Sequence, residues 1–259
     1  MPVTAGRNDK ALLLGIAPRQ IRSKNRTHTH THNCLYILLV YVKMKSINPI
    51  NYMKKIIHNM TYTNDLIIRS ALKGFLEKHH ANDERVRIIE ELGIQHGTAR
   101  VDIAVVNGIL HGYEIKSDQD TLRRLPEQMD VFNAVFDKIT LVVGKTHLYE
   151  AINMVPEWWG ITIAKNNSNS PVTFNLIREG ELNKKQDSFS IAQLLWREEA
   201  LEILDEQGEA KGFYSKTRDL IYEKLSVVFD QENLGEKVRE ALFLRKDWRP
   251  DSPLMLSGD

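Results

Sequence analysis

Residues 100–116 have the sequence RVDIAVVNGILHGYEIK, and this stretch decides the expected fold. Its first part, Val101 to Val106, is rich in β-branched residues and predicts a strand. Asn107-Gly108 is a strong signal for a tight turn between two strands, and Ile109 to Lys116 is the expected returning strand. The stretch therefore predicts an antiparallel hairpin.

Three charged residues on this hairpin point to metal chemistry. Side chains alternate along a strand, so Glu114 and Lys116 share one face of the returning strand. If Asp102 lies beside Glu114, the two carboxylates repel each other, and a divalent cation between them relieves that repulsion. A lysine next to such a cation can orient a water molecule or stabilise charge on a phosphate. The pattern therefore favours hydrolysis of a phosphodiester.

The site requires a particular register of the hairpin. A plain two-residue turn at Asn107-Gly108 would put Asp102 on the face opposite Glu114, because a shift of one residue reverses the faces. We therefore predict a one-residue offset. Either a three-residue loop with Gly108 in the left-handed conformation or a bulge at Gly112 supplies it.

A second E-x-K triplet, Glu209-Ala210-Lys211, shows how little the triplet means alone. It lies in a polar connection between helices with no aspartate on a preceding strand, so we interpret it as solvated surface. A surface ion pair across a hairpin is the corresponding alternative for the first triplet. The strand context and Asp102 favour the metal site.

The remainder of residues 60–180 predicts an α/β fold, a mixed sheet flanked by helices. The expected helices cover about 63–80, 120–135 and 147–154, and the further strands cover 86–92, 138–143, 160–164 and, at the edge, 172–177. Pro126 lies inside the second helix. It predicts either a kink or a helix that restarts with Pro126 in its first turn.

The two ends of the chain have different patterns. Residues 186–259 are wholly helical in pattern, with expected helices at 191–204, 217–229 and 234–244, and form a C-terminal helical extension. Residues 1–59 lack a sustained period and are expected to be a disordered or mis-assigned extension, with the true start at Met44, Met53 or Met60, of which Met60 is favoured because regular patterning begins directly after it.

Bulk composition excludes several classes of protein. The chain of 259 residues has 42% hydrophobic residues, a net charge of +1 and a single cysteine, Cys34. One cysteine excludes an intrachain disulfide framework and thiolate zinc sites, and it fits a cytoplasmic location. The apolar run at 34–42 is too short to span a bilayer, which needs roughly 20 residues. We therefore expect no membrane association.

The hairpin and the helix after it resemble the PD-(D/E)XK, restriction-endonuclease-like superfamily of nucleases. The aspartate at Asp102, the E-x-K triplet at Glu114 and the Gln128-Met129-Asp130-Val131-Phe132 segment carry the likeness, although Phe132 replaces the tyrosine of the superfamily's Q-x-x-x-Y element. The wider stretch from Ile67 to Arg249 is similar to an uncharacterised bacterial branch of that superfamily. The recurring sequence motifs of that branch appear here as GYEIKSD at 112–118, PEWWG at 156–160 and LWREEA at 195–200.

The resemblance implies roles for the residues of the motif. Asp102 and Glu114 would bind Mg²⁺ or Mn²⁺, with the carbonyl oxygen of Ile115 as a further ligand. Lys116 would position the attacking water, and Gln128 would approach the site from its helix.

Other positions are weaker candidates. Glu91 is the expected extra ligand if a second metal binds, with Glu90 as its competitor. Arg100, Arg123 and Arg124 are candidates for contact with nucleic-acid phosphates, against the alternative of ordinary solvated arginines.

The sequence thus predicts a Mg²⁺-dependent nuclease acting on DNA, with RNA or branched structures as further substrates and a homodimer or larger complex left open. The alternative is a catalytically silent nucleic-acid-binding or interaction module with the same fold. The intact triad of Asp102, Glu114 and Lys116 argues against that alternative.

Overall fold

The structure is a computed structural model that describes residues 62–167 and 170–246. Its six strands form one mixed sheet in chain order: β1 (Arg87–Ile94), β2 (Ala99–Val106), β3 (Leu110–Lys116), β4 (Lys138–Val143), β5 (Gly160–Asn167) and β6 (Ser170–Arg178). Strands β1 to β3 are antiparallel to one another, β3 to β5 are parallel, and β6 returns antiparallel to β5. This confirms the mixed sheet, and all the predicted strands are present.

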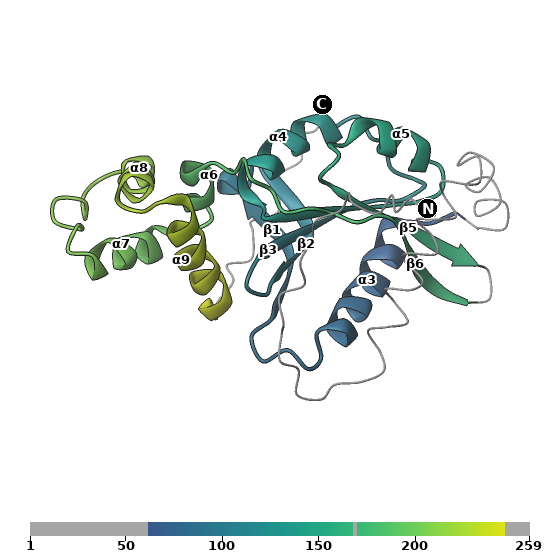
Figure 1. Ribbon diagram of the computed structural model, residues 1–259, viewed down its shortest axis with the longest axis horizontal. Helices are drawn as coiled ribbons and strands as arrows, with labels where there is room; N and C mark the ends of the chain where they lie inside the picture. The colour runs from purple at the N-terminus through teal and green to yellow at the C-terminus, as the bar shows by residue number, and fades with distance from the viewer. Residues whose placement is uncertain (1–61, 168–169, 247–259) are drawn as a thin grey trace, which may run out of the picture. The chain divides into compact units, whose positions relative to one another are not determined.

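Helices cover both faces of this sheet (Figure 1). Helix α3 (Asp65–His79) lies on one face, while α4 (Leu125–Val135) and α5 (Leu148–Met154) lie on the other. Asn64 caps α3 by accepting a hydrogen bond of 2.9 Å from the backbone N–H of Ile67. The result is a three-layer α/β/α arrangement.

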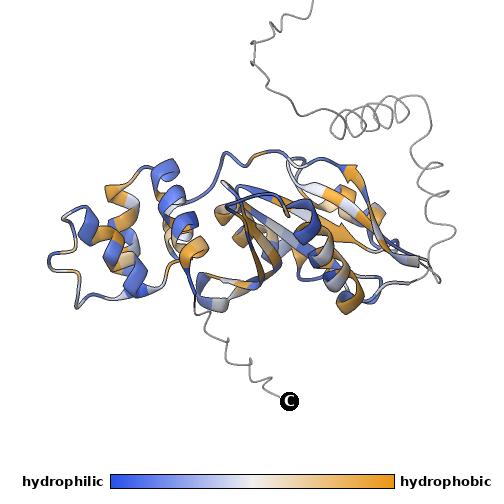
Figure 2. Cartoon of the chain, turned by 90° about the horizontal axis from the view of Figure 1, so that it is seen from below, coloured by the Kyte–Doolittle hydropathy of each residue, from blue (hydrophilic) through white to orange (hydrophobic). Residues whose placement is uncertain are grey.

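The core beneath α3 holds the hairpin in place. Buried residues along α3 pack against alternating residues of the strands: Ile68, Leu72, Leu76, Ile103, Val105, Ile115, Val142 and Ala164. Figure 2 shows the apolar residues of the strands in orange. Because Ile115 faces α3, its neighbours Glu114 and Lys116 face the other helical layer.

The β2–β3 hairpin has the offset that the site requires. Its loop has three residues, 107–109, and Gly108 has a φ of +68°. Gly112 stays in the regular ladder, so the first of the two predicted alternatives is confirmed. The paired residues end at Ile103 with Tyr113, so one further step along both strands leads to Asp102 and Glu114.

Helix α4 begins later than predicted. We expected a helix from about residue 120, but α4 starts at Leu125 with Pro126 in its first turn. Proline has no backbone N–H and disrupts a helix interior, whereas the first turn has no internal acceptor for that N–H. Of the two predicted outcomes, the restarted helix is the one observed.

The described part of the C-terminal extension, up to residue 246, contains four helices rather than the three predicted: α6 (Ser188–Ala192), α7 (Arg197–Glu206), α8 (Arg218–Val228) and α9 (Gln231–Leu244). The expected helix over 191–204 divides at residues 193–196. The division has a local cause, because the Glu199 carboxylate accepts a hydrogen bond of 2.7 Å from the Trp196 N–H and so starts a new helix there. Arg239 of α9 reaches back to Asp137 beside the sheet, at 3.2 Å.

The predictions for residues 1–59 and for a start at Met60 fall outside the described residues. Within the described part of the chain, no helix is both long enough and apolar enough to cross a membrane.

Candidate metal site

Asp102 lies where β2 and β3 separate. The last backbone pair of this ladder on the side away from the turn is Ile103 with Tyr113. Beyond it, the Ile115 N–H donates a hydrogen bond of 2.6 Å to Oδ2 of Asp102. The Asp102 carboxylate therefore takes the place of a backbone acceptor and is held against β3.

Glu114 is the most buried charged residue of the site, with 2% of its surface exposed. Its Oε1 accepts hydrogen bonds from Lys116 Nζ at 2.7 Å and from Gln128 Nε2 at 2.8 Å. Its Oε2 and the Oε1 of Gln128 are buried without a hydrogen-bond partner among the described residues. These two buried acceptor oxygens have neither a hydrogen-bond donor nor a cation. Buried acceptors without a partner lower the stability of the folded state.

The electrostatics of the pair agree with this geometry. Burial, followed by the negative charge of Asp102, raises the pKa of Glu114 to about 7. Burial also raises the pKa of Asp102, against the opposing effects of the Ile115 N–H and Arg69. For both carboxyl groups burial is the largest cause of the raised pKa, because it disfavours the charged form.

Gln128 reaches the site, but the aromatic residue of the same helix element does not. Phe132 is fully buried, with its ring centroid 5.7 Å from that of Phe136 and 6.3 Å from that of Trp159. The position thus lies in an apolar environment, where a phenyl ring packs without needing a hydrogen-bond partner.

Arg69 joins the site from α3, although no sequence motif marks this residue. Its Nη2 lies 2.5 Å from Asp102 Oδ1, its Nη1 contacts Glu91 Oε1, and its Nε lies 3.2 Å from Asp65 Oδ2. One signal was present in the sequence. Residue 69 follows the buried Ile68 on α3, so an arginine there sits next to the face that packs on the sheet.

Glu91 and Glu90 have different environments. Glu91 has a φ of +55°, and the paired residues on β1 pass from Glu90 directly to Leu92. The register is the same on both sides of Glu91, which therefore stands at the position opposite Asp102, while its positive φ takes its backbone out of strand geometry. Glu91 contacts Arg69 of the site, whereas Glu90 pairs with Lys73 on the solvent side.

The residues present fit a divalent cation through a small ligand set. Among the described residues there is no group of three or more His, Cys, Asp or Glu side chains arranged to hold a metal. Mg²⁺ is usually bound by one or two carboxylates with water completing its shell. The two carboxylates that would meet that smaller requirement are Glu114, through its unpartnered Oε2, and Asp102, whose oxygens also accept hydrogen bonds from Arg69 and Ile115.

The three arginines predicted to contact phosphates lie in different settings. Arg100 Nη1 is 3.6 Å from Glu91 Oε2, next to the site. Arg123 and Arg124 are exposed just before α4. Their contact with nucleic acid stays a prediction.

A cleft of about 630 Å³ adjoins the site. Glu91 and Arg100 line it from the sheet, and Trp196, Arg218 and Arg245 line it from the C-terminal extension. Glu91 and Arg100, which contact the site residue Arg69 or each other, are therefore accessible from this cleft.

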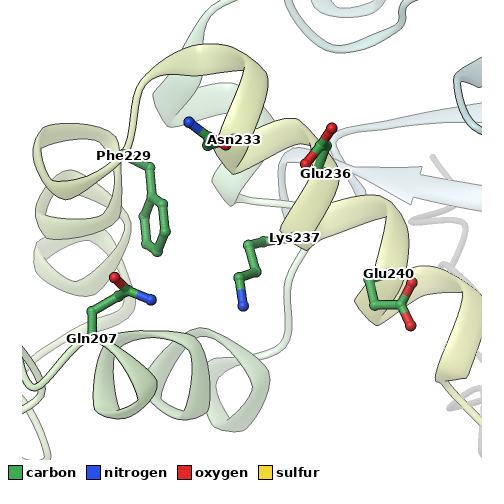
Figure 3. Close-up of a pocket in the computed structure, with 6 residues that line it drawn as sticks. All are labelled: Gln207, Phe229, Asn233, Glu236, Lys237 and Glu240. Atoms are coloured by element: carbon green, nitrogen blue, oxygen red, sulfur yellow. The ribbon is translucent and has the colours of Figure 1, made fainter.

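Another hollow, of about 560 Å³, lies within the C-terminal extension (Figure 3). It is lined by Gln207, Phe229, Asn233, Glu236, Lys237 and Glu240. Lys237 is paired with Glu206 at 2.6 Å, so its charge is already balanced within the extension.

A protein-family model described as bacteriophage P4 protein cII matches residues 58–257. The chain belongs to this family. Protein cII of Enterobacteria phage P4 is 32% identical over 121 residues, which make up 47% of this chain and 46% of that protein. The chain thus aligns with about half the length of this curated relative. The range matched by the cII family model includes every residue of the candidate site.

One solved structure also shows a likeness to this cII-family chain. It is a protein of unknown function from Silicibacter pomeroyi, with 16% identity and a TM-score of 0.31, and the match covers 52% of this chain and 87% of that one. A likeness of this size does not assign the fold.

Proposed function

We propose that this cII-family chain is a divalent-metal-dependent nuclease with a PD-(D/E)XK core, acting on DNA. The observation that carries the proposal is the buried Glu114, which bonds to Lys116 and Gln128 and keeps one oxygen unpartnered, on the strand whose Ile115 N–H donates to Asp102. A surface ion pair would not require a buried glutamate with an unpartnered oxygen. The restriction-endonuclease-like fold is part of this proposal, supported by the α/β/α layers and the mixed sheet.

Different residues of the site would bind the metal and orient its ligands. Asp102, Glu114 and the Ile115 carbonyl would hold Mg²⁺ or Mn²⁺, which when bound makes a coordinated water more acidic and neutralises charge on a phosphate. Gln128 orients the Glu114 carboxylate by occupying Oε1 and leaving Oε2 open.

Lys116 contributes a positive charge inside the site. Its side chain is 9% exposed and its Nζ bonds to Glu114 at 2.7 Å. An ammonium at this depth is screened little by water, so it can hold a water molecule or a phosphate oxygen firmly.

The adjoining cleft supports a polymeric substrate. It opens beside Glu91 and Arg100 and extends to Arg218 of the C-terminal extension. A strand lying along it would pass the edge of the site and would place phosphates near arginines.

Cleavage assays with matched variants test the proposal. Single-stranded, duplex and branched DNA and RNA are incubated with purified protein in Mg²⁺, Mn²⁺ or EDTA. We expect metal-dependent cleavage of DNA, and a loss of about 100-fold or more in Lys116→Met. Lys211→Met is the control, because Lys211 is exposed and belongs to the second E-x-K triplet, far from the hairpin in sequence.

The outcomes separate the candidates. Equal cleavage by wild type and folded Lys116→Met would refute the catalytic role of Lys116. DNA binding without cleavage under any metal condition would instead favour a catalytically silent binding module.

A further inference from the structure

Arg69 lies among three carboxylates, those of Asp102, Glu91 and Asp65. Asp102 and Glu91 belong to adjacent strands, and Asp65 lies one turn earlier on α3. The guanidinium contacts all three, with distances of 2.5 Å to Asp102 and 3.2 Å to Asp65.

The position of Glu91 is adapted to this contact. Its positive φ removes it from the regular ladder, a conformation that costs a non-glycine residue free energy and persists only when the surroundings hold it. Its carboxylate is contacted by Arg69, and Arg100 lies 3.6 Å from its other oxygen. Two arginines thus supply positive charge to Glu91.

An arginine cannot give up its charge as a lysine or histidine can. Its guanidinium stays protonated at any ordinary pH, and its planar fork matches carboxylates on several sides. A second metal ion between Asp102 and Glu91 would have to sit against that cation. Arg69 is only 18% exposed, so water would screen the repulsion poorly.

We propose that Arg69 takes the position of a second metal ion, so that the site binds a single divalent cation through Asp102 and Glu114. Glu91 and Asp65 then serve to hold Arg69 rather than a metal. The inference rests on the proposed function, since it presupposes that Asp102 and Glu114 bind metal. It makes Arg69 a positioning residue, which fixes Asp102 and supplies a permanent positive charge.

Mn²⁺ titration by calorimetry, with free Mn²⁺ followed by electron paramagnetic resonance, tests the proposal without any nucleic acid. We expect one Mn²⁺ per wild-type chain and loss of that ion in Asp102→Asn. Glu91→Gln should keep one Mn²⁺ with an affinity within about threefold of wild type. Arg69→Gln should gain a second Mn²⁺, and the double variant Arg69→Gln with Glu91→Gln should lose it again.

Each alternative outcome has a distinct meaning. Two Mn²⁺ per wild-type chain, one of them lost in Glu91→Gln, would overturn the inference and leave the proposed function standing. Loss of all Mn²⁺ binding in Glu91→Gln would also overturn it, by making Glu91 a ligand of the only ion. A wild type without any Asp102-dependent Mn²⁺ site would overturn both proposals. If Arg69→Gln does not fold, wild type and Glu91→Gln still decide the matter.

Discussion

Gln128 on α4 donates a hydrogen bond of 2.8 Å from its Nε2 to Oε1 of Glu114 on β3. This bond joins the helix that covers the sheet to the most buried acid of the candidate site. The two residues are 14 apart in the sequence. The two elements meet only because α4 packs over β3.

Removing this donor should destabilise the fold even without metal. In Gln128→Ala, Glu114 loses one of its two hydrogen-bond donors in a buried position, at a cost of about 1–3 kcal/mol. Urea unfolding in EDTA measures the change. Gln119→Ala is the control, because Gln119 is exposed, and it should stay within about 0.5 kcal/mol of wild type. Equal stability of the two variants would show that the bond to Glu114 contributes nothing.

The left-handed residue of the hairpin loop should tolerate asparagine better than alanine. Gly108 has a φ of +68°, and a Cβ built there meets nothing within 4 Å. The cost of Gly108→Ala is therefore purely conformational, about 1 kcal/mol. Gly108→Asn should cost less, because asparagine adopts this conformation more readily. Thermal or urea unfolding that ranked alanine above asparagine would contradict the three-residue loop.

Substitution of Gly144 should lower stability because a side chain there would collide with Asp118, not because of the backbone conformation of Gly144. A Cβ at Gly144 would lie 2.5 Å from Asp118 Oδ1 and 2.7 Å from the Asp118 backbone nitrogen. Asp118 cannot easily move, since its carboxylate accepts hydrogen bonds from both Thr63 and Thr146 at 2.7–2.9 Å. We expect Gly144→Ala to lower the free energy of unfolding by about 1–3 kcal/mol.

Gly74 in α3 provides the matched comparison. Its Cβ position is open, so Gly74→Ala should raise the free energy of unfolding by about 0.5–1 kcal/mol through helix propensity. The two glycine-to-alanine changes should therefore have opposite signs in the same urea experiment. The same sign for both would mean that the contact of residue 144 with Asp118 is not as close as described.

His111 should make stability fall in acid. Its ring bonds to Thr140 and Tyr113, and burial, followed by the charge of Lys138, lowers its pKa to about 3. The unfolded chain takes up a proton near pH 6.5, whereas the folded chain does so only near pH 3. The stability from His111 is therefore complete above pH 6.5 and is lost as the pH falls toward 3, by up to about 1.4 kcal/mol per pH unit.

The comparison with His111→Gln isolates this effect. Glu114, whose pKa is raised to about 7, contributes in the opposite direction, since its stabilisation is greatest in acid and declines between about pH 4.5 and 7. Both proteins contain Glu114, so its contribution cancels in their difference. Urea unfolding between pH 7.5 and 4.5 should show the advantage of wild type over His111→Gln shrinking as the pH falls. A constant difference would mean that His111 titrates normally.

Much of the fold could be predicted because local patterns and packing agree. The β-branched run of β2 is buried against α3, so its preference for a strand and its place in the core point the same way. Pro126 limited the start of α4 to two possibilities, and packing selected the first-turn position. The break between α6 and α7 could not be predicted, because the apolar period runs through residues 193–196 and the Glu199 cap is what interrupts the helix.

By itself, the sequence determined the members of the carboxylate pair and the lysine beside them, since the alternation of one strand places Glu114 and Lys116 on a common face. It left three geometries for the hairpin, namely a plain two-residue turn, a three-residue loop or a bulge at Gly112, and only the last two fit the metal site. Only the tertiary structure decided which one forms, because the conformation of Gly108 is set by the strands that it joins. Only the tertiary structure brought Arg69 to Asp102, 33 residues apart in sequence, because a contact between layers depends on how α3 packs on the sheet.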